Sequence, residues 1–512
     1  MFEYGPMPPL MFGSMILFLL IGFPVAFTLA AVGAVFAILG IAFDHFTPSL
    51  LNALPLRFYG VVSNELMLAI PFFTFMGAIL ERSKLAEDLL EGAGQLFGPT
   101  PGGVAYAVIL VGAVVGAITG TVAASVIAMG VVSLPVMMRY GYSKRIATGV
   151  IAASGTITQV IPPSLVLIIL ADQLGRSVGD MYKGAIGPSI LQVLIFLMFI
   201  FVVAKLRPHL VPALPPEART MSGRALVWKV AKSMVPSLAL IFIVLGTMFM
   251  GLATPTEAGA MGAIGAMLLA MAQRRLTWGL TREAMAMTMR ITAMVIFILI
   301  GATVFSLSFQ GLDGGHWIAH LLSHIPGGAV GFLLFVNVFI FFIAFFLDFF
   351  EIAFIIVPLL VPVANSLGID LIWFGVLLCV NLQTAFMHPP FGFALFYLRS
   401  IAPPEVKTSD IYLGAIPWLC LQLLLVVVLI FFPQSVTFFL TPEAVVDPSS
   451  IHLNVPMPGD PSSAPGTPSF GAPQAPSFGA PPAPSFGAPA APSFEAPAAP
   501  SFGAPAAPSF GQ

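Results

Sequence analysis

The sequence predicts an all-α polytopic membrane protein with two inverted-topology repeats, each holding a re-entrant hairpin and a broken helix, and a disordered C-terminal tail. The first observation is composition: 58% of the 512 residues are hydrophobic and 8% are charged, whereas a soluble domain carries about 25% charged residues. The second is a series of short motifs that recurs in the second half of the chain at a nearly constant offset. The third is a matched pair of polar, proline-containing interruptions within apolar segments.

Uncharged runs long enough to cross a bilayer begin near the N-terminus. A membrane-spanning helix takes roughly 20 apolar residues, and uncharged runs cover residues 10–41, 101–138, 234–250 and 415–433. The first run lacks a small-residue cleavage site of the signal-peptide type, so we expect residues 1–65 to form a retained span and scaffold segment. The net charge of −2 gives no indication of a nucleic-acid partner.

An internal duplication organises the chain into a first repeat over residues 66–205 and a second over residues 290–440. Motifs of the first half recur 225 to 230 residues later, as small loop insertions would produce. Paired halves of this kind are common in secondary transporters, often with inverted topology. The recurring motifs are Pro135-Val136 with Pro362-Val363, Gly141 with Gly368, Pro162-Pro163 with Pro389-Pro390, Pro101-Gly102-Gly103 with Pro326-Gly327-Gly328, and the segment beginning at Tyr182 with that beginning at Tyr412.

Charge placement supports the inversion, because Lys and Arg accumulate on cytoplasmic loops. Basic residues are densest around residues 206–233, which we interpret as a cytoplasmic linker followed by scaffold helices over residues 234–289. On the resulting topology, all but three of the 20 basic residues are cytoplasmic, the exceptions being Arg57, Arg176 and Lys183. The C-terminal tail would then emerge on the periplasmic side.

Each repeat contains an apolar stretch that is too long for one simple span. The first covers about residues 104–138 and is interrupted at Gly116 and Gly120, and its partner covers about residues 329–365. If both ends of each stretch lie on one side of the membrane, each stretch forms a re-entrant hairpin. The first tip would lie at residues 120–125, which read Gly-Thr-Val-Ala-Ala-Ser.

The second hairpin tip carries two carboxylates, Asp348 and Glu351. They are three residues apart and would share a helix face. An ionisable residue inside the membrane indicates function, so we expect this pair to bind a cation or to help gate. The alternative is a tip near the aqueous boundary with solvated carboxylates.

A polar break interrupts the apolar segment that follows each hairpin. The breaks cover Ala153–Ser164 and Asn381–Gly392, and Ser154 falls opposite Asn381 at the offset of 227. Irregular backbone at membrane depth occurs where it lines a protein cavity, and hydroxyl, amide and freed carbonyl oxygens suit Na⁺. The alternative is that the prolines only kink packed helices, but the symmetric pair favours a functional site.

Two other groups have simpler interpretations. Glu257 follows Pro255 and is expected to cap a helix N-terminus. His316, His320 and His324 recur every four residues, a spacing that can hold a metal ion on one helix face. Because no fourth ligand is evident, a partly exposed interfacial helix is the favoured interpretation.

The end of the chain, residues 450–512, is a repetitive segment. The unit Pro-Ser-Phe-Gly-Ala-Pro recurs there with a period of eight. Such a composition cannot bury enough apolar surface to fold, so we expect this tail to be disordered.

Outside this tail, over roughly residues 8–439, the sequence resembles the large membrane subunit of TRAP (tripartite ATP-independent periplasmic) transporters. The two polar breaks and the segment around Glu257 carry most of this resemblance. The resemblance implies an elevator-type permease, not an enzyme, that imports an organic acid with Na⁺ and uses no cofactor. It also implies a bacterial inner (plasma) membrane location and two obligatory partners, a small membrane subunit and a periplasmic substrate-binding protein. The segments that carry it are residues 69–77, Ala153–Ser164, Thr254–Ala258, Asn381-Leu382 and Pro389–Gly392.

The resemblance also implies roles for individual residues. His388 stands where a Thr is frequent in the family, and Ala385 where a Gly is frequent, so coupling could include H⁺ through His388. The cation-binding and substrate-proximal role would fall on Ser154, Gly155, Thr156, Pro162 and Ser164 in the first repeat and on Asn381, Gln383, Thr384, His388 and Pro389 in the second. The hairpin-tip role would fall on Gly120, Thr121, Ser125, Asp348 and Glu351.

Two other functions compete with this interpretation. The chain could be a stand-alone divalent-anion/Na⁺ symporter with a similar two-hairpin plan, which would need no binding protein. It could also be a membrane scaffold without translocation, although the paired polar breaks argue against that. The sequence contains no protease, hydrolase or nucleotide-binding motif that would indicate an enzyme.

Overall fold

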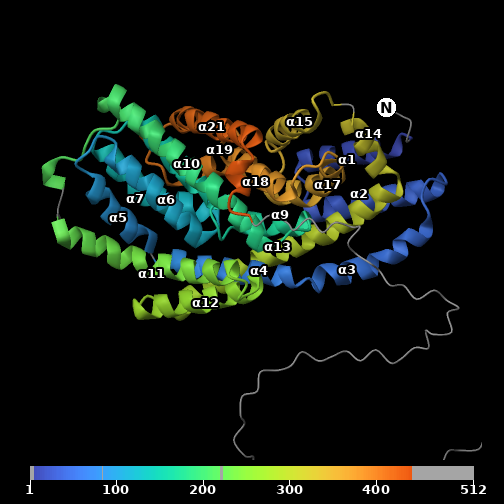
Figure 1. Cartoon of the computed structure of the whole chain (residues 1–512), viewed down its shortest axis with the longest axis horizontal. Helices are drawn as coiled ribbons and strands as arrows, with labels where there is room; N and C mark the ends of the chain where they lie inside the picture. Colours follow the sequence, from blue (N-terminus) through green and yellow to red (C-terminus); the bar gives the residue numbers. More distant parts are fainter. Residues whose placement is uncertain (1–4, 84, 219–222, 324, 441–512) are drawn as a thin grey trace, which may run out of the picture. The chain divides into compact units, whose positions relative to one another are not determined.

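The computed structural model describes residues 5–440 except residues 84, 219–222 and 324, and every regular element in these residues is a helix (Figure 1). Eight described helices are long and apolar enough to cross a membrane, or up to nine if a bent pair counts as one span. The predicted all-α polytopic membrane fold is therefore confirmed. The tail, residues 450–512, lies outside the described residues.

The same order of elements occurs twice: two helices, a long helix, a short helix, a helical hairpin, a broken helix and a final long helix, where α3 and α4, which are bent by 42° at the break between them, together form the long helix of the first half. The first half comprises α1 (Met7–Ile21), α2 (Val25–Ala42), α3 (Leu54–Val62), α4 (Glu65–Arg82), α5 (Leu85–Phe97), α6 (Gly103–Thr119), α7 (Val122–Arg139), α8 (Lys144–Thr156), α9 (Leu165–Gln173) and α10 (Val178–Leu206). The second half comprises α11 (Gly223–Phe249), α12 (Pro255–Ala272), α13 (Trp278–Gly311), α14 (Gly314–Ser323), α15 (Gly328–Ile343), α16 (Phe349–Glu351), α17 (Val357–Ser366), α18 (Leu371–Leu382), α19 (Thr384–Met387), α20 (Phe393–Ile401), α21 (Thr408–Phe431) and α22 (Gln434–Thr437).

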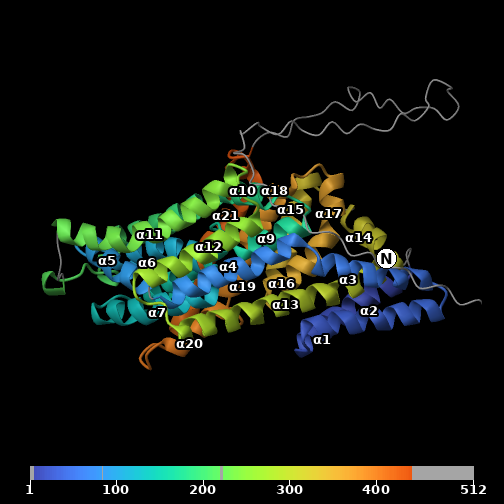
Figure 2. The same cartoon turned by 90° about the horizontal axis from the view of Figure 1, so that it is seen from below.

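The helices form two packing groups that mix the two halves. In the first group, which we call the scaffold group, α4 packs along α12 and α13 packs along α2. In the second, the core group, α8 packs against both α7 and α21, α10 packs against α18, and α9 packs against both α10 and α18. Figures 1 and 2 show α4, α11 and α12 running side by side, with the core helices α10, α18 and α21 beyond them.

Both hairpins predicted from the sequence are confirmed. The first joins α6 to α7 at Gly120, whose φ of +63° lies in the left-handed region that favours glycine. The interruption predicted at Gly116 is wrong, because this residue stays inside α6. A Cβ at Gly116 would lie 3.0 Å from the Cα of Thr158, so the glycine allows α6 to approach the first break closely.

The second hairpin turns through residues 344–348 and continues through α16, a π-helical turn at Ile352–Ile356 and α17. Its base lies on the opposite side of Figure 1 from the base of the first hairpin, and the two hairpins point toward each other.

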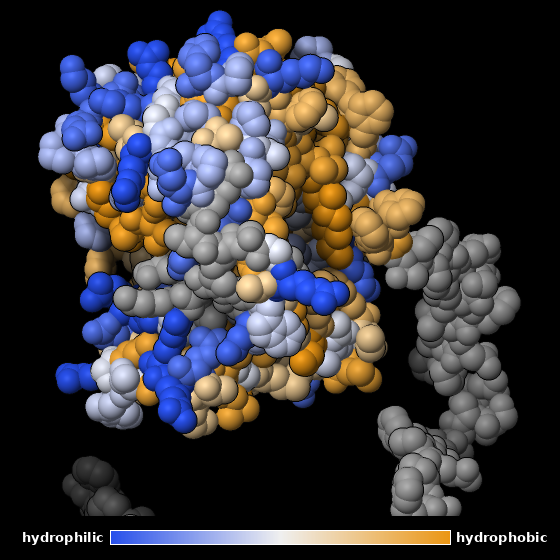
Figure 3. All heavy atoms as spheres, turned by 90° about the vertical axis from the view of Figure 1, so that its left-hand side faces the viewer, coloured by the Kyte–Doolittle hydropathy of each residue, from blue (hydrophilic) through white to orange (hydrophobic). Residues whose placement is uncertain are grey.

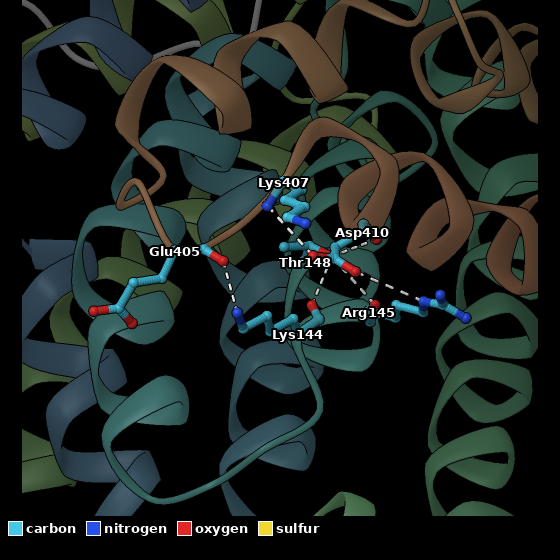
Figure 4. A network of polar contacts seen from close by, with 6 residues as sticks. All are labelled: Lys144, Arg145, Thr148, Glu405, Lys407 and Asp410. Atoms are coloured by element: carbon cyan, nitrogen blue, oxygen red, sulfur yellow. Dashed lines mark hydrogen bonds and ion pairs between the residues drawn. The ribbon is translucent and has the colours of Figure 1, made fainter.

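A polar network joins the start of α8 to the start of α21 (Figure 4). Lys144 Nζ donates to Glu405 O at 2.6 Å, and Arg145 Nε lies 3.7 Å from Asp410 Oδ1. The Thr148 hydroxyl lies within hydrogen-bond distance of backbone carbonyls of both helices. Figure 3, which views the left-hand side of Figure 1, shows many hydrophilic residues on that face.

The predicted cap at Glu257 is confirmed. Thr254 and Glu257 form a reciprocal capping box at the start of α12, in which Thr254 N donates to Glu257 Oε2 at 2.8 Å.

Tyr142, between α7 and α8, is buried and accepts a hydrogen bond from Val104 N at 3.2 Å, which joins the two ends of the first hairpin. Burial raises the pKa of Tyr142 to about 12.

Candidate functional site

The two hairpin tips meet at one pocket of about 190 Å³. The first tip contributes its turn and the first residues of α7, and the second contributes the first residues of α16. The tip residues that line the pocket are Gly120, Thr121, Val122 and Ala123 from the first hairpin and Asp348, Phe349 and Phe350 from the second. The structure therefore places both predicted tips in one site.

The rest of the pocket wall comes from the broken helices and from α13. Gln159 lies within the first break and Leu165 directly follows it, and Phe386 lies in α19 within the second break. Ile291 and Met294 of α13 close the pocket from the scaffold group. The remaining lining residues are Val166 of α9 and Tyr397 of α20. Sequence analysis did not predict the contribution of α13 or Tyr397.

The first break is held against the first hairpin by hydroxyl groups. After α8 the chain makes a 3-10 turn and resumes as α9 at Leu165. Thr158 Oγ1 lies 3.0 Å from Ser125 Oγ in the first turn of α7 and 2.7 Å from Gly155 O. The Ser164 hydroxyl donates to Gln159 O across the break. Two predicted residues, Ser125 and Gly155, thus share Thr158 as a hydrogen-bond partner, and Ser164 bonds within the break itself.

Ser154 is fully buried, and among the described residues its hydroxyl has no hydrogen-bond partner. The backbone of α6 comes close at this point, because a Cβ on Gly112 would lie 2.7 Å from Ser154 Cβ. A buried hydroxyl of this kind has unused capacity to bind a ligand.

The matching residue in the second break, Asn381, lies against the second hairpin. Asn381 Nδ2 donates to Asn337 O of α15 at 2.8 Å, and Thr384 Oγ1 donates to Asn381 O at 2.7 Å. The Oδ1 atoms of Asn381 and Asn337 are both buried and have no partner among the described residues. Sequence analysis missed Asn337, although a lone amide within an apolar hairpin helix was an available signal.

Gln383 lies in a different environment from the other predicted residues of the second break. Its Oε1 accepts from Gln192 Nε2 of α10 at 2.6 Å and from Gln422 Nε2 of α21. Gln383 Nε2 donates in turn to Gln192 Oε1 at 3.2 Å. All three side chains are fully buried, so this glutamine cluster joins the second break to both long helices of the core group.

His388 is packed among aromatic rings. Its imidazole stacks on Phe345 with centroids 3.8 Å apart and meets Phe341 edge-on. It is 1% exposed, its two ring nitrogens have no hydrogen-bond partner among the described residues, and it does not line the tip pocket.

The other predicted break residues tie the two breaks together. Thr156 Oγ1 contacts Ala153 O at 2.8 Å and Met387 Sδ at 3.6 Å, which joins one break to the other. Pro162 and Pro389 are each the first residue of a Pro-Pro pair that is joined by a cis peptide bond.

Asp348 and Glu351 form a capping box at the start of α16. Asp348 Oδ1 accepts from Phe349 N at 2.6 Å, and Asp348 N donates to Glu351 Oε2 at 3.1 Å. Both carboxylates therefore bind the N-terminus of their own helix, and Glu351 is only 8% exposed.

The predicted histidine cluster is only partly described. His316 and His320 lie on α14, and His324 lies outside the described residues. Within residues 5–440, apart from the gaps, no group of three or more His, Cys, Asp or Glu residues could hold a metal ion.

Comparisons with known proteins agree with this architecture. Residues 12–435 match the family described as Tripartite ATP-independent periplasmic transporter, DctM component. The chain is 28% identical over 392 residues to the C4-dicarboxylate TRAP transporter large permease protein DctM of Pseudomonas aeruginosa, covering 76% of this chain and 89% of that protein. It is 26% identical over 414 residues to the sialic acid TRAP transporter large permease protein SiaM of Vibrio cholerae, covering 81% of this chain and 93% of that protein.

Among solved structures, the chain is similar to the YdaH transporter of Alcanivorax borkumensis, which was described as having an unusual topology. The TM-score is 0.55 at 15% sequence identity, and the alignment covers 84% of this chain and 98% of that one. This similarity concerns the fold alone.

Proposed function

The chain belongs to the DctM component family of tripartite ATP-independent periplasmic transporters, and from this membership we propose that it imports an organic acid coupled to a sodium gradient. Family membership makes the chain a large permease subunit and not an enzyme. The observation that carries the proposal is that two hairpin tips and two broken helices, one of each per half, enclose a single pocket. Sites of this kind, at the interface of repeats, are where secondary transporters bind solute and ion.

Sodium coupling is supported by buried oxygen atoms around the breaks. Na⁺ is coordinated in such transporters by unwound backbone carbonyls and helix ends. Ser154 Oγ next to the first break, and Oδ1 of Asn337 and Asn381 next to the second, are buried and unpaired among the described residues. We propose that these groups, with the carbonyls freed at the breaks, hold the coupling cation, with H⁺ through His388 as the alternative.

Two partners and a location follow from the family. We propose a small membrane subunit and a periplasmic substrate-binding protein, in the bacterial inner membrane, with the C-terminal tail on the periplasmic side. A relative in Oleidesulfovibrio alaskensis is named as an isethionate TRAP transporter permease protein DctMQ. Because relatives are named for different solutes, the names leave the substrate of this chain open.

The experiment is uptake into proteoliposomes that contain this chain and its small subunit, with the proposed periplasmic substrate-binding protein added outside. A panel of organic acids is tested with and without an inward Na⁺ gradient. We expect uptake to require both the gradient and the binding protein, and Ser154→Ala or Asn381→Ala to reduce it by about tenfold or more, as loss of a buried ligand does.

Each other result selects a competing function. Uptake without a binding protein would indicate a stand-alone symporter. Uptake driven by a pH gradient alone would keep the carrier and reject the sodium sites. If neither variant changed uptake, the polar breaks would be structural and the scaffold alternative would gain support.

A further inference from the structure

We propose that the tip pocket selects a small monocarboxylate with an apolar, preferably aromatic, body, whose carboxylate binds the open N-terminus of α7 and whose body packs on Phe349, Phe350 and Phe386. This inference rests on the proposed function, since it names the class of acid that the permease carries. It follows from an asymmetry between residues at matching positions of the two halves.

The first asymmetry concerns the two hairpin tips. Thr121 and Asp348 match at the offset of 227, and each is the N-cap residue of the helix that leaves its tip. Asp348 fills its own helix N-terminus with a carboxylate. Thr121 does not cap α7, and its buried hydroxyl has no partner among the described residues.

The N-terminus of α7 therefore has the properties of an anion site. The first backbone N–H groups of a helix have no acceptor within it, and the helix dipole favours negative charge there. Thr121, Val122 and Ala123 line the pocket, so the N-terminus of α7 borders the space where a solute would lie. One half supplies a carboxylate from its own chain, and the other half is open to a carboxylate from the solute.

Gln159 gives independent support for a ligand. It lines the pocket, is 3% exposed, and its Oε1 has no hydrogen-bond partner among the described residues. An unpaired buried acceptor costs free energy unless a ligand supplies a donor. A hydroxyl group beside the solute carboxylate would supply that donor.

The second asymmetry concerns the body of the solute. Phe349, Phe350 and Phe386 stand where the first half has Val122, Ala123 and Gln159. The second half therefore presents three nearly buried aromatic rings, and Ile291 and Met294 extend this apolar surface. Rings of this kind favour an apolar or aromatic partner.

Charge disfavours a dicarboxylate. None of the described residues that line the pocket is Lys or Arg, and the only ionisable carboxylate among them is Asp348. A second negative charge on the solute would lie near Asp348 with no Lys or Arg side chain beside it, and like charges repel strongly in a low-dielectric site.

The test uses three α-hydroxy acids that share one head group and differ in the body: mandelate (phenyl), lactate (methyl) and malate (carboxymethyl). Mandelamide keeps the ring and removes the charge. Binding of radiolabelled mandelate to the purified complex of this chain and its small subunit is measured in saturating Na⁺, without binding protein, and the other three compounds compete. We expect mandelate to bind at least about tenfold more tightly than each competitor. Only mandelate supplies both a carboxylate for the N-terminus of α7, which we call the anion pole, and a ring for Phe349, Phe350 and Phe386, which we call the aromatic pole.

The aromatic pole is tested by exchanging matching residues between the halves. Phe386→Gln places the first-half residue in the pocket and should weaken mandelate binding by about tenfold or more, with little effect on lactate. The control is Phe396→Gln, the same substitution at an exposed position of α20 that lies outside both the second break and the pocket lining, and it should leave binding unchanged.

The anion pole is tested at Thr121. Thr121→Asp gives α7 the same cap that Asp348 gives α16 and should abolish mandelate binding, while the thermal stability of the complex is kept or raised by the new cap. Thr121→Asn caps α7 without charge and should weaken binding less. Loss of binding together with loss of stability in Thr121→Asp, with no weakening in Thr121→Asn, would overturn the assignment of the anion pole.

The outcomes separate this inference from the proposed function. If malate or lactate bound as tightly as mandelate while sodium-driven uptake of any organic acid was observed, the selectivity proposed here would be wrong and the carrier function would stand. If no acid of the panel was taken up with Na⁺ and binding protein, the carrier function itself would fail.

Discussion

The residues that stabilise the core group most specifically are the three glutamines. Gln192, Gln383 and Gln422 are fully buried and hydrogen-bond one another across three helices. A buried amide that loses its partner keeps its desolvation cost, so such clusters are sensitive to a single substitution. Gln383 matters most because its Oε1 accepts from both neighbours.

Replacing Gln383 with Met should therefore destabilise the protein. Met preserves volume but leaves the amides of Gln192 and Gln422 without their shared acceptor, at about 1–3 kcal/mol for each group. Thermal unfolding of the purified complex measures this loss. Gln434→Met, at an exposed position, is the matched control, and equal unfolding temperatures for the two variants would contradict a structural role of the cluster.

His388 offers a residue-scale test of the coupling ion. Because its ring packs between Phe341 and Phe345 and does not line the pocket, we expect His388→Phe to preserve the packing and to remove two unpaired buried nitrogens. Sodium-driven uptake should stay within about twofold of the unmodified protein, since no ligand is lost. The pH profile of uptake should also be unchanged in His388→Phe. His388→Ala, which removes the ring, should instead lower the thermal stability of the protein. A pH dependence that disappears in His388→Phe would instead assign proton coupling to this residue.

At the scale of elements, close backbone approach contributes more than ion pairs to the contact of α8 with α21. A Cβ at Gly149 would lie 2.2 Å from Gly414 O, so these helices touch through their backbones. The nearby pair of Arg145 and Asp410 is 3.7 Å apart, and the arginine side chain is 60% exposed.

These contacts predict unequal effects. Gly149→Ala should destabilise the protein by about 1–3 kcal/mol, because one helix must shift to admit the methyl group. Asp410→Asn should cost no more than about 1 kcal/mol, as expected of a long ion pair whose arginine is largely exposed. Thermal unfolding at low and high salt compares the two, and a larger, salt-sensitive loss in Asp410→Asn would reverse the ranking.

The elements themselves were largely predictable. Both hairpins, the two proline breaks and the cap at Glu257 follow from local residue types and from the repeat offset, because glycine, proline and capping residues act within a few positions. The interruption at Gly116 was predicted wrongly, because a glycine inside an apolar run signals close packing as readily as a break.

The site was less predictable than the elements, because its walls come from distant segments. Ile291, Met294 and Tyr397 carry no local signal that would associate them with the tips. Gln192 and Gln422 were recoverable, since the offset of 230 that matches Tyr182 with Tyr412 also matches them, and both stand in otherwise apolar helices.

At the scale of the whole molecule, the division into scaffold and core groups suggests which parts move. Asn64, before α4 in the scaffold group, donates from Nδ2 to Asp172 Oδ1 of α9 in the core group at 2.7 Å. Next to this contact lies a cavity of about 380 Å³ lined by Arg57, Thr303 and other residues of both groups. If transport moves the core past the scaffold, this contact must break in every cycle.

Cross-linking tests that motion. In a Cys420→Ala background, a short thiol cross-linker across Asn64→Cys and Asp172→Cys should arrest sodium-driven uptake, and reversal of the link should restore it. The same reagent across Arg145→Cys and Asp410→Cys, which joins two core helices, should leave most uptake intact. Arrest by both pairs, or by neither, would argue against movement of the core as one body.

The glutamine cluster also bears on how the two halves diverged. Gln192 and Gln422 are counterparts at the offset of 230, and both donate to the same oxygen atom of Gln383, so matching residues of the two halves converge on a single point. A point of that kind can be occupied by only one side chain, and the counterpart of Gln383 is Thr156. Two identical halves could not both place a glutamine there. Because the two halves are joined in one chain, each can hold a different residue at this position, and the point where the counterparts converge is therefore asymmetric.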